Sequence, residues 1–432
     1  MKTIVLGAGV VGVTTAYYLA KAGHQVVVID RQSAAAAETS YANAGLIAPG
    51  HSFTWNSPRA PKLLLQSIWR KDLAYRMHFS LDPRFWIWGL KFLRACTAGS
   101  ARANTLIKLR LCRYSQAKIE EIAAAEGLSY HQYKKGLLYF YRDPEHFQQG
   151  IRNMTLMQEQ GQTIEIVDAR RCVEIEPALK PIESKLAGAI YCPNDGSGDC
   201  NLFTLQLAER CRRLGVEFRF ETPILGLEAR GGRIAAVRTE KGPVAGDAYV
   251  LSLGSFSPIV ARSAGLDLPV YPVKGFSLTL PIDPALAPTV GGVDEGSLVA
   301  YCGMGDRLRM TATADFSGYD NSHRPEDFAT MMAVARELFP KGVDFSKPRY
   351  WSCLRPMTPD GPPIIGASPI ANLWLNTGQG HMGWTMSCGS SRVLADLMLG
   401  RQPEIATAGL DFARYGNGAA AAPSGDAPAR AA

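Results

Sequence analysis

The sequence lacks the cysteine spacing that marks a metal site or a disulfide scaffold. Its nine cysteines never form a Cys-x-x-Cys pair, their number is odd and their spacing is irregular. Zinc and iron–sulfur sites take their ligands from closely spaced cysteines or histidines. We therefore expect free thiols in a reducing compartment and no bound metal.

Long runs without charge are also scarce. Residues 3–20 carry no charge and follow Lys2, as a signal peptide or a membrane anchor would. Three glycines within six positions and an immediate second strand argue against both. No other uncharged run is long enough to span a bilayer. We expect a cytoplasmic protein, with the inner face of the cytoplasmic membrane as the alternative location.

The excess of basic residues is small and scattered. Lys and Arg number 46 against 39 Asp and Glu, a formal net charge of +7. No basic run is interleaved with aromatic residues as in a nucleic-acid-binding module, so nucleic acid is not an expected partner. A mildly basic surface still suits anionic small molecules or an anionic membrane. With 432 residues, 47% of them hydrophobic, the chain has room for two domains.

The first thirty residues carry the strongest signal. An apolar strand at 3–6 runs into a glycine turn, Gly7-Ala8-Gly9-Val10-Val11-Gly12, followed by a helix at 13–22 and a second apolar strand at 26–29 that ends on Asp30. Strand, glycine turn, helix, strand and acid in this order form the dinucleotide-binding fingerprint. The free N–H groups of the helix N-terminus can bind a pyrophosphate, and the Asp30 carboxylate can accept a hydrogen bond from the adenosine ribose.

A second glycine turn lies far along the chain. Residues 351–366 predict a strand, a turn and a strand, and 374–376 predict a further strand. The glycine-rich stretch 377–383 then opens a helix at 384–399. A helix N-terminus at this position would make a second anion-stabilising site.

Two stretches between the glycine turns predict other structure. Residues 61–127 have a helical pattern, in which residues 85–93 are strongly apolar. Packing in a helical core is the favoured interpretation of 85–93, and contact with a membrane or a protein partner is the alternative. Residues 271–280 and 298–313 predict an antiparallel sheet in a second domain.

Several motifs together resemble the D-amino acid oxidase superfamily of flavoproteins, and within it the D-amino acid dehydrogenase small-subunit group. The motifs are Glu38-Thr39-Ser40-x-Ala42-Asn43-Ala44-Gly45, the run from Asn194 to Thr204, Tyr271-Pro272-Val273-Lys274-Gly275, Leu354-Arg355-Pro356-Met357-Thr358-Pro359-Asp360-Gly361, and the run from Leu375 to Met386. The resemblance implies FAD and the oxidative deamination of D-amino acids to 2-oxo acids and ammonia. It further implies hydride transfer to flavin N5 and a respiratory electron acceptor, a quinone or a carrier, in place of oxygen.

The fold implied is of the α/β class, with a Rossmann-type FAD-binding domain interleaved with an α+β substrate domain that carries a mainly antiparallel sheet. The predicted segments are 1–60, 191–268 and 351–414 for the FAD-binding domain, 61–190 for a mixed insertion and part of the substrate domain, 269–350 for the substrate domain, and 415–432 for a disordered tail.

The resemblance also implies which residues hold the cofactor, with residues 380–385 placed at the flavin pyrimidine ring. The residues assigned to FAD are Val5, Leu6, Gly7, Ala8, Gly9, Val10, Val11, Gly12, Asp30, Arg31, Ser40, Asn43, Ala44, Gly45, Leu46, Ile224, Gly254, Gly380, His381, Met382, Gly383, Trp384 and Thr385.

Arg355 is the main candidate for binding substrate, because a guanidinium matches a carboxylate with two hydrogen bonds. In the resembling family the arginine of this turn binds the substrate carboxylate. Tyr271, Tyr301 and His51 are further candidates, each with a structural role as the alternative. The family often has histidine where Gln379 stands, and Gly303, Met304, Gly305 and Ala312 replace residues usual in close relatives. A preference for D-alanine is therefore not implied.

Two rival functions stay open at this point. One is a related amine-oxidising flavoenzyme of the glycine, sarcosine or D-hydroxyproline type. The other is a nucleotide-binding subunit without redox chemistry.

Overall fold

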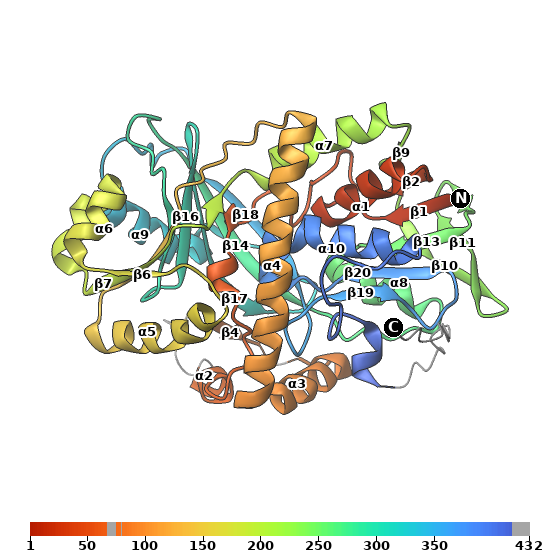
Figure 1. Ribbon diagram of the computed structural model, residues 1–432, viewed down its shortest axis with the longest axis horizontal. Helices are drawn as coiled ribbons and strands as arrows, with labels where there is room; N and C mark the ends of the chain where they lie inside the picture. The colour runs from red at the N-terminus through yellow and green to blue at the C-terminus, as the bar shows by residue number, and fades with distance from the viewer. Residues whose placement is uncertain (67–74, 79, 417–432) are drawn as a thin grey trace, which may run out of the picture.

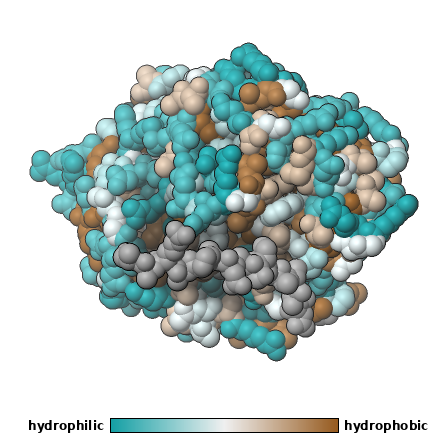
Figure 2. All heavy atoms as spheres, turned by 45° about the vertical axis from the view of Figure 1, so that its right-hand side comes forward, coloured by the Kyte–Doolittle hydropathy of each residue, from teal (hydrophilic) through white to brown (hydrophobic). Residues whose placement is uncertain are grey.

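A computed structural model of the chain describes residues 1–66, 75–78 and 80–416. It has two halves, each built on its own sheet, and the long helix α4 (Ala98–Glu126) runs across the junction between them (Figure 1). All nine cysteines are free thiols. On the face drawn in Figure 2 hydrophilic residues predominate, with hydrophobic residues in small groups between them.

The first half holds a six-stranded sheet in the order β19-β20-β13-β1-β2-β9, parallel except for its edge strand β19. Its central strands are mainly apolar because helices cover one face and a small antiparallel sheet covers the other. The elements are β1 (Lys2–Leu6), β2 (Gln25–Ile29), β9 (Glu217–Arg219), β13 (Ala248–Leu251), β19 (Ile364–Ala367), β20 (Leu373–Thr377), the helices α1 (Val10–Lys21), α7 (Cys200–Arg213), α8 (Ser257–Arg262) and α10 (Gly383–Met398), and the small sheet β10 (Ile224–Arg230), β11 (Arg233–Thr239) and β12 (Gly242–Val244).

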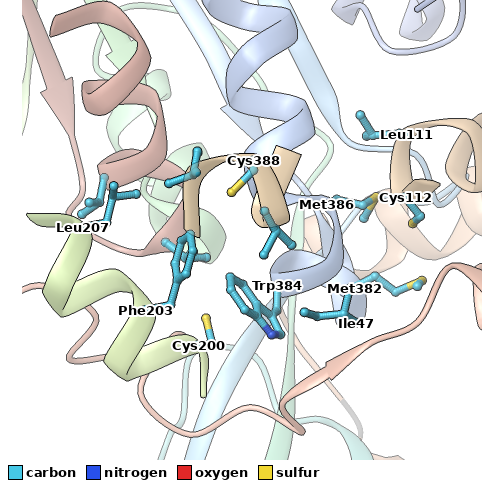
Figure 3. Packing of buried hydrophobic residues seen from close by; sticks show 14 of the residues in the cluster. Ile47, Leu111, Cys112, Cys200, Phe203, Leu207, Met382, Trp384, Met386 and Cys388 are labelled. Carbon is cyan, nitrogen blue, oxygen red and sulfur yellow. The ribbon is translucent and has the colours of Figure 1, made fainter. Parts of the chain in front are cut away.

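Helix α10 is the centre of the largest hydrophobic cluster. Its side chains pack between Phe203 and Leu207 of α7 on one side and Leu111 of α4 on the other (Figure 3). The ring of Trp384 lies 4.9 Å from that of Phe203. This packing fixes the N-terminus of α10, at the second glycine turn, relative to α1.

The second half is a nine-stranded, mainly antiparallel sheet in the order β18-β14-β17-β16-β15-β5-β7-β6, with β4 paired to β17. Strand β5 is buried on both faces: Leu138 and Phe140 contact one hydrophobic cluster, and Leu137 and Tyr139 the other. The elements are β4 (Tyr75–Met77), β5 (Leu137–Tyr141), β6 (Glu165–Val167), β7 (Gly188–Cys192), β14 (Tyr271–Pro281), β15 (Gly291–Asp294), β16 (Val299–Met304), β17 (Arg307–Phe316), β18 (Arg349–Met357), and the helices α5 (Pro144–Glu159), α6 (Ala169–Ile175) and α9 (Ala329–Leu338).

The remaining elements connect or cover these halves. Helices α2 (Ala60–Gln66) and α3 (Pro83–Ala95) lie together at the lower edge of the molecule in Figure 1. The short pair β3 (Leu46–Ile47) and β8 (Gly196–Ser197) joins the loop after β2 to the start of α7. Short 3₁₀ helices occupy Pro49–His51, Gly254–Phe256, Pro325–Phe328, Gly380–Met382 and Phe412–Tyr415, and a nine-residue 3₁₀ helix spans Pro177–Lys185.

The predicted fold class is confirmed, and the structure differs from the expected details in three places. Strand β4 interrupts the stretch 61–127, expected to be helical, because pairing with β17 overrides the local helical pattern. The expected boundary at 351 falls inside β18, which pairs with β14 in the second sheet. Tyr415, placed in the predicted tail, hydrogen-bonds to Asp360. Residues 417–432 of that tail lie outside the described residues.

Candidate active site

A cavity of about 700 Å³ lies between the two sheets. On one side it is lined by residues that follow the carboxyl ends of β1, β2 and β13, where open parallel sheets bind their ligands. On the other side it is lined by β14, β17 and β18 of the second sheet. Volumes of this size are typical of cofactor and substrate sites.

The first glycine turn forms the wall at the β1 end. A Cβ atom at Gly12 would lie 1.9 Å from the carbonyl oxygen of Gly7, so only glycine allows α1 to approach the turn this closely. Gly9, the residue before α1, has no side chain to cap that helix, whereas Asp82 caps α3 and Asp199 caps α7. The N-terminus of α1 is thus available to phosphate oxygens of a ligand.

Asp30 stands where the fingerprint predicts, at the end of β2 and in the cavity wall. Its carboxylate accepts hydrogen bonds from the backbone N–H groups of Ala8 (2.7 Å) and Gln32 (2.8 Å). Burial raises the pKa of this carboxyl, and the two N–H groups oppose the shift. Arg31 beside it donates to Glu38 (2.6 Å) and covers the ring of Phe256.

The loop at 40–45 joins both halves of the molecule to the cavity. Ser40 Oγ accepts the backbone N–H of Val10 at 3.0 Å, which ties this loop to the start of α1. From the second sheet, Arg309 donates to the carbonyl of Asn43 (3.0 Å) and the Cys302 thiol lies 3.1 Å from the carbonyl of Ala44. The loop is therefore held from two sides.

The second glycine turn converges on the same cavity as the first. Gly380, His381, Met382, Gly383, Trp384 and Thr385 all line it. Thr14 on α1 hydrogen-bonds to Ser391 on α10 at 2.7 Å, and Asn376 donates to Thr15 at 3.1 Å. Two helix N-termini from distant parts of the chain thus point into one site, as the sequence predicts.

Most of the residues expected at a cofactor line this cavity, and four lie behind its wall. Ile224 and Gly254 are among those that line it. The others are Gly7, Gly9, Val10, Val11, Asp30, Arg31, Ser40, Asn43, Ala44, Gly45 and Leu46. Those in the supporting layer are Val5, Leu6, Ala8 and Gly12.

Arg355 projects into the cavity from β18. Its Nη1 donates to the carbonyl of Thr313 at 2.6 Å, and its guanidinium lies against Gly275. Burial lowers the pKa of this guanidinium, with Cys353 and Tyr75 opposing the shift. No carboxylate of the described residues forms an ion pair with it, although many other arginines have one. An enclosed cation of this kind suits an anionic ligand.

Both candidate tyrosines lie outside the cavity wall. Tyr301 is 0% exposed, its ring packs against Phe140 and Phe339, and its hydroxyl has no hydrogen-bond partner among the described residues. Its neighbour Ala300 lines the cavity, and alternate side chains of a strand face opposite ways. Tyr271 packs against Phe85 and Trp88 of α3. Neither tyrosine is placed to reach a ligand in the cavity.

The cavity wall also contains aromatic residues that sequence reasoning missed: Phe53, Trp55, Tyr75, Tyr139, Phe256 and Phe276. They are scattered over the sequence without a shared motif, so only the tertiary structure reveals their grouping. His51 and His381, both sequence candidates, stand among them. His51 stacks on Tyr139 (4.7 Å between ring centres) and its Nε2 lies 3.1 Å from Glu295 Oε1.

A Rossmann-type sheet, two helix N-termini whose N-cap residues make no side-chain cap, and an enclosed arginine in one cavity define a class of protein: a two-domain, dinucleotide-dependent oxidoreductase. A family model described as FAD dependent oxidoreductase matches residues 2–397. The chain belongs to that family.

Proteins of similar sequence match this chain over almost its full length. A protein named D-amino acid dehydrogenase 2 of Mesorhizobium japonicum is 48% identical over 414 residues, which are 95% of this chain and 100% of that one. A D-amino acid dehydrogenase of Paramagnetospirillum magneticum is 44% identical over 96% of this chain and 99% of its own. Among solved structures, glycine oxidase from Geobacillus kaustophilus superposes with a TM-score of 0.73 at 23% identity, covering 95% of this chain and 98% of that one.

The residues of the cavity fit FAD. The close approach of Gly12 and Gly7 leaves the room that a pyrophosphate needs beside the backbone. Ser252 Oγ, also in the cavity wall, is buried and has no hydrogen-bond partner within the described ranges. A buried hydroxyl of this kind calls for a partner on a ligand. The second helix N-terminus at 380–385 suits a group that gains negative charge on reduction.

Proposed function

We propose that this chain is an FAD-dependent D-amino acid dehydrogenase, which converts D-amino acids to 2-oxo acids and ammonia. The observation that carries the proposal is the Arg355 guanidinium, enclosed in the cavity wall and without a carboxylate partner in the part of the chain that the structure describes. The names of the relatives at 41–48% identity support the same substrate class.

The roles of the residues follow from their contacts. Arg355 binds the substrate carboxylate through the guanidinium N–H groups that do not donate to the carbonyl of Thr313. This contact fixes the position of the substrate Cα. FAD, when bound, supplies the hydride acceptor. His381, whose pKa burial lowers well below its usual value, is neutral beside Arg355, so it adds no second positive charge that would repel a substrate ammonium. The imino acid product is hydrolysed by water.

The electron acceptor in this proposal is a respiratory quinone or carrier, reached at a membrane. None of the helices in the described ranges is long and apolar enough to cross a membrane. Helix α3, however, has two apolar faces. Phe85, Trp88 and Phe92 face the core, and a second set, which includes one leucine just before the helix, is 49–88% exposed. We call this second set the α3 surface: Leu81, Trp86, Ile87, Leu90 and Leu93.

The charges around the α3 surface favour an anionic lipid bilayer as its partner. Arg84, Lys91 and Arg94 lie on the same helix, and the acid nearest in sequence, Asp82, is engaged by Arg84 at 2.7 Å. Amphipathic helices that lie on membranes combine exposed Trp and Leu with flanking Lys and Arg in this way. This surface supports the interpretation of 85–93 as a membrane contact in addition to core packing.

A spectrum and a substrate panel test the proposal. Purified protein should be yellow and release FAD on denaturation. With a dye acceptor it should oxidise D-amino acids, and should leave the L-enantiomers, glycine and sarcosine largely unreacted. A colourless protein that cannot be reconstituted with FAD would support the rival nucleotide-binding subunit. Preference for glycine, sarcosine or D-hydroxyproline would support the rival amine-oxidising flavoenzyme.

A further inference from the structure

Three ring-bearing side chains of the cavity wall, Trp55, Tyr75 and His381, pack as one group. Trp55 stacks on His381, with 5.0 Å between ring centres and planes 20° apart, and meets Tyr75 edge-on at 6.0 Å. Tyr75 pairs with Ala314 of β17, the residue after Thr313, whose carbonyl accepts the hydrogen bond from Arg355, and Trp55, Tyr75, His381 and Arg355 all line the same cavity. A substrate anchored at Arg355 by its carboxylate would therefore place its side chain near these rings.

A second group of rings continues the wall. His51 stacks on Tyr139 and meets Phe53 edge-on at 5.9 Å. Aliphatic side chains complete this part of the cavity: Val293, Leu298, Ala300 and Ala314. The rings come from four separate parts of the chain: residues 51–55, Tyr75 of β4, Tyr139 of β5 and His381 of the second glycine turn.

Charge is almost absent from this end of the cavity apart from Arg355. The acidic side chains that line the cavity among the described residues, Asp30 and Glu38, are both engaged: Asp30 accepts from the N–H groups of Ala8 and Gln32, and Glu38 accepts from Arg31. Glu295 is only 14% exposed and its Oε1 lies 3.1 Å from His51 Nε2, so its charge faces the imidazole. A cationic substrate side chain finds no free carboxylate here. Lys108 also acts on His381, but it is 1% exposed, lies behind the cavity wall and donates to the carbonyl of Phe53 at 2.8 Å, so Arg355 is the cation that an anionic side chain would meet at the wall itself.

We infer that Trp55, Tyr75 and His381 form the side-chain subsite of the enzyme, and that it takes D-amino acids with aromatic or large apolar side chains in preference to D-alanine or charged D-amino acids. The inference rests on the proposed function. Offset and edge-to-face ring contacts add to the hydrophobic gain when an aromatic side chain is buried among aromatic residues. A methyl side chain would leave most of this wall without contacts.

The first experiment compares substrates on the FAD-loaded enzyme with a dye acceptor. Since a single methylene in an apolar pocket changes kcat/KM by about 10-fold or more, we expect D-phenylalanine to exceed D-alanine by at least about 10-fold, with D-lysine and D-glutamate lower still. Trp55→Ala should lower kcat/KM for D-phenylalanine by about 10-fold or more and change that for D-alanine by less than about threefold. Phe345→Ala, at a ring packed under Arg336 outside the cavity, is the matched control and should change neither.

The second experiment measures binding without turnover. Calorimetry with 3-phenylpropanoate and propanoate, which carry the carboxylate but no amine, should give at least about 10-fold tighter binding of the phenyl compound to wild-type protein. Trp55→Ala should remove that difference. Tyr75→Leu provides the same test from the other side of the ring group if Trp55→Ala does not fold.

The outcomes separate this inference from the proposed function. An enzyme that oxidises D-amino acids but turns over D-alanine, D-lysine or D-glutamate as well as D-phenylalanine overturns the subsite and leaves the function intact. A folded Trp55→Ala protein that loses its flavin, and that keeps the wild-type substrate preference after reconstitution with FAD, also overturns the subsite. That result would mean that the Trp55 ring contacts the cofactor and not the substrate side chain. A protein that oxidises no D-amino acid refutes the proposed function itself.

Discussion

The guanidinium of Arg355 occupies the space where a side chain at Gly275 would begin. A Cβ atom at Gly275 would lie 2.4 Å from Cζ and 2.4 Å from Nη2 of Arg355. The two residues are on the paired strands β14 and β18, so glycine on one strand is what allows the arginine of the other to lie across it. The position of the proposed carboxylate anchor therefore depends on a residue that contacts no ligand itself.

Gly275→Ala should displace the guanidinium without removing it. Because a misplacement of about 1 Å at a positioning group can cost up to about 100-fold in rate, we expect kcat/KM for D-amino acids to fall by about 10- to 100-fold, mainly through a raised KM. FAD content should stay unchanged. Gly89→Ala is the control, since a Cβ atom at this helical glycine meets nothing within 4 Å. Unaltered kinetics in Gly275→Ala would contradict the anchoring geometry.

Arg355→Leu should keep bound flavin and lose most turnover. Removing one member of a buried charge pair costs about 2–5 kcal/mol, so kcat/KM should fall by about 30-fold or more. Steady-state kinetics and the flavin absorbance at equal protein concentration measure the two effects separately. Arg349→Leu, at an exposed arginine of the same strand, should behave as wild type. Normal turnover in Arg355→Leu would show that the carboxylate binds elsewhere.

Gly12→Ala should abolish FAD binding. The added Cβ atom would lie 1.9 Å from the Gly7 carbonyl oxygen, and a backbone atom in a tight turn cannot move aside as a side chain can. We expect the purified variant to be colourless while circular dichroism reports a folded protein. Retention of stoichiometric FAD would mean that α1 can shift away from the turn, and that this close approach is not required.

Asp195→Asn should change how stability depends on pH. Asp195 is buried, accepts hydrogen bonds from Gly50, Tyr139 and Gln162, and desolvation raises its pKa to about 7 despite these bonds. An acid whose folded pKa is raised contributes stability below its unfolded pKa and loses that contribution as pH rises through the folded pKa.

The wild-type protein should therefore lose stability between about pH 4 and 7, by up to about 4 kcal/mol from this residue alone. In Asp195→Asn that part of the pH dependence should be missing. The thermal midpoint of the variant should therefore change less with pH over this range than the midpoint of the wild-type protein. Asp306→Asn, at a side chain 79% exposed, should leave the wild-type pH dependence in place. Identical pH profiles for wild type and Asp195→Asn would show that Asp195 stays ionised throughout.

Replacing Leu90 and Leu93 together by Gln should weaken binding to vesicles that contain anionic lipid. Each leucine is about half exposed, and burying an exposed leucine in an apolar phase yields about 1.5 kcal/mol or more, so affinity should fall by at least about 10-fold. Activity with a dissolved dye should not change. The double variant Leu214→Gln and Leu225→Gln, at exposed leucines remote from α3 in sequence, is the control. Sedimentation with vesicles measures the lipid binding of both double variants.

The sequence by itself determined the nucleotide end of the site. Strand, glycine turn, helix and acid are close together in the chain, and each step of that motif is set by local sterics and hydrogen bonding. The order of residues 1–30 therefore predicts β1, α1, β2 and the position of Asp30 without reference to the rest of the molecule. The same holds for the second glycine turn and α10.

Only the tertiary structure decided the substrate end. Strand pairing turned Tyr301 into the core while its neighbour Ala300 lines the cavity, and long-range packing made a strand of residues 75–77 within a stretch of helical pattern. The rings of Trp55, Tyr75 and His381 meet because distant segments are folded onto one another. Such contacts leave no periodicity or motif in the chain, since the residues that meet are separated by sequence of unrelated pattern.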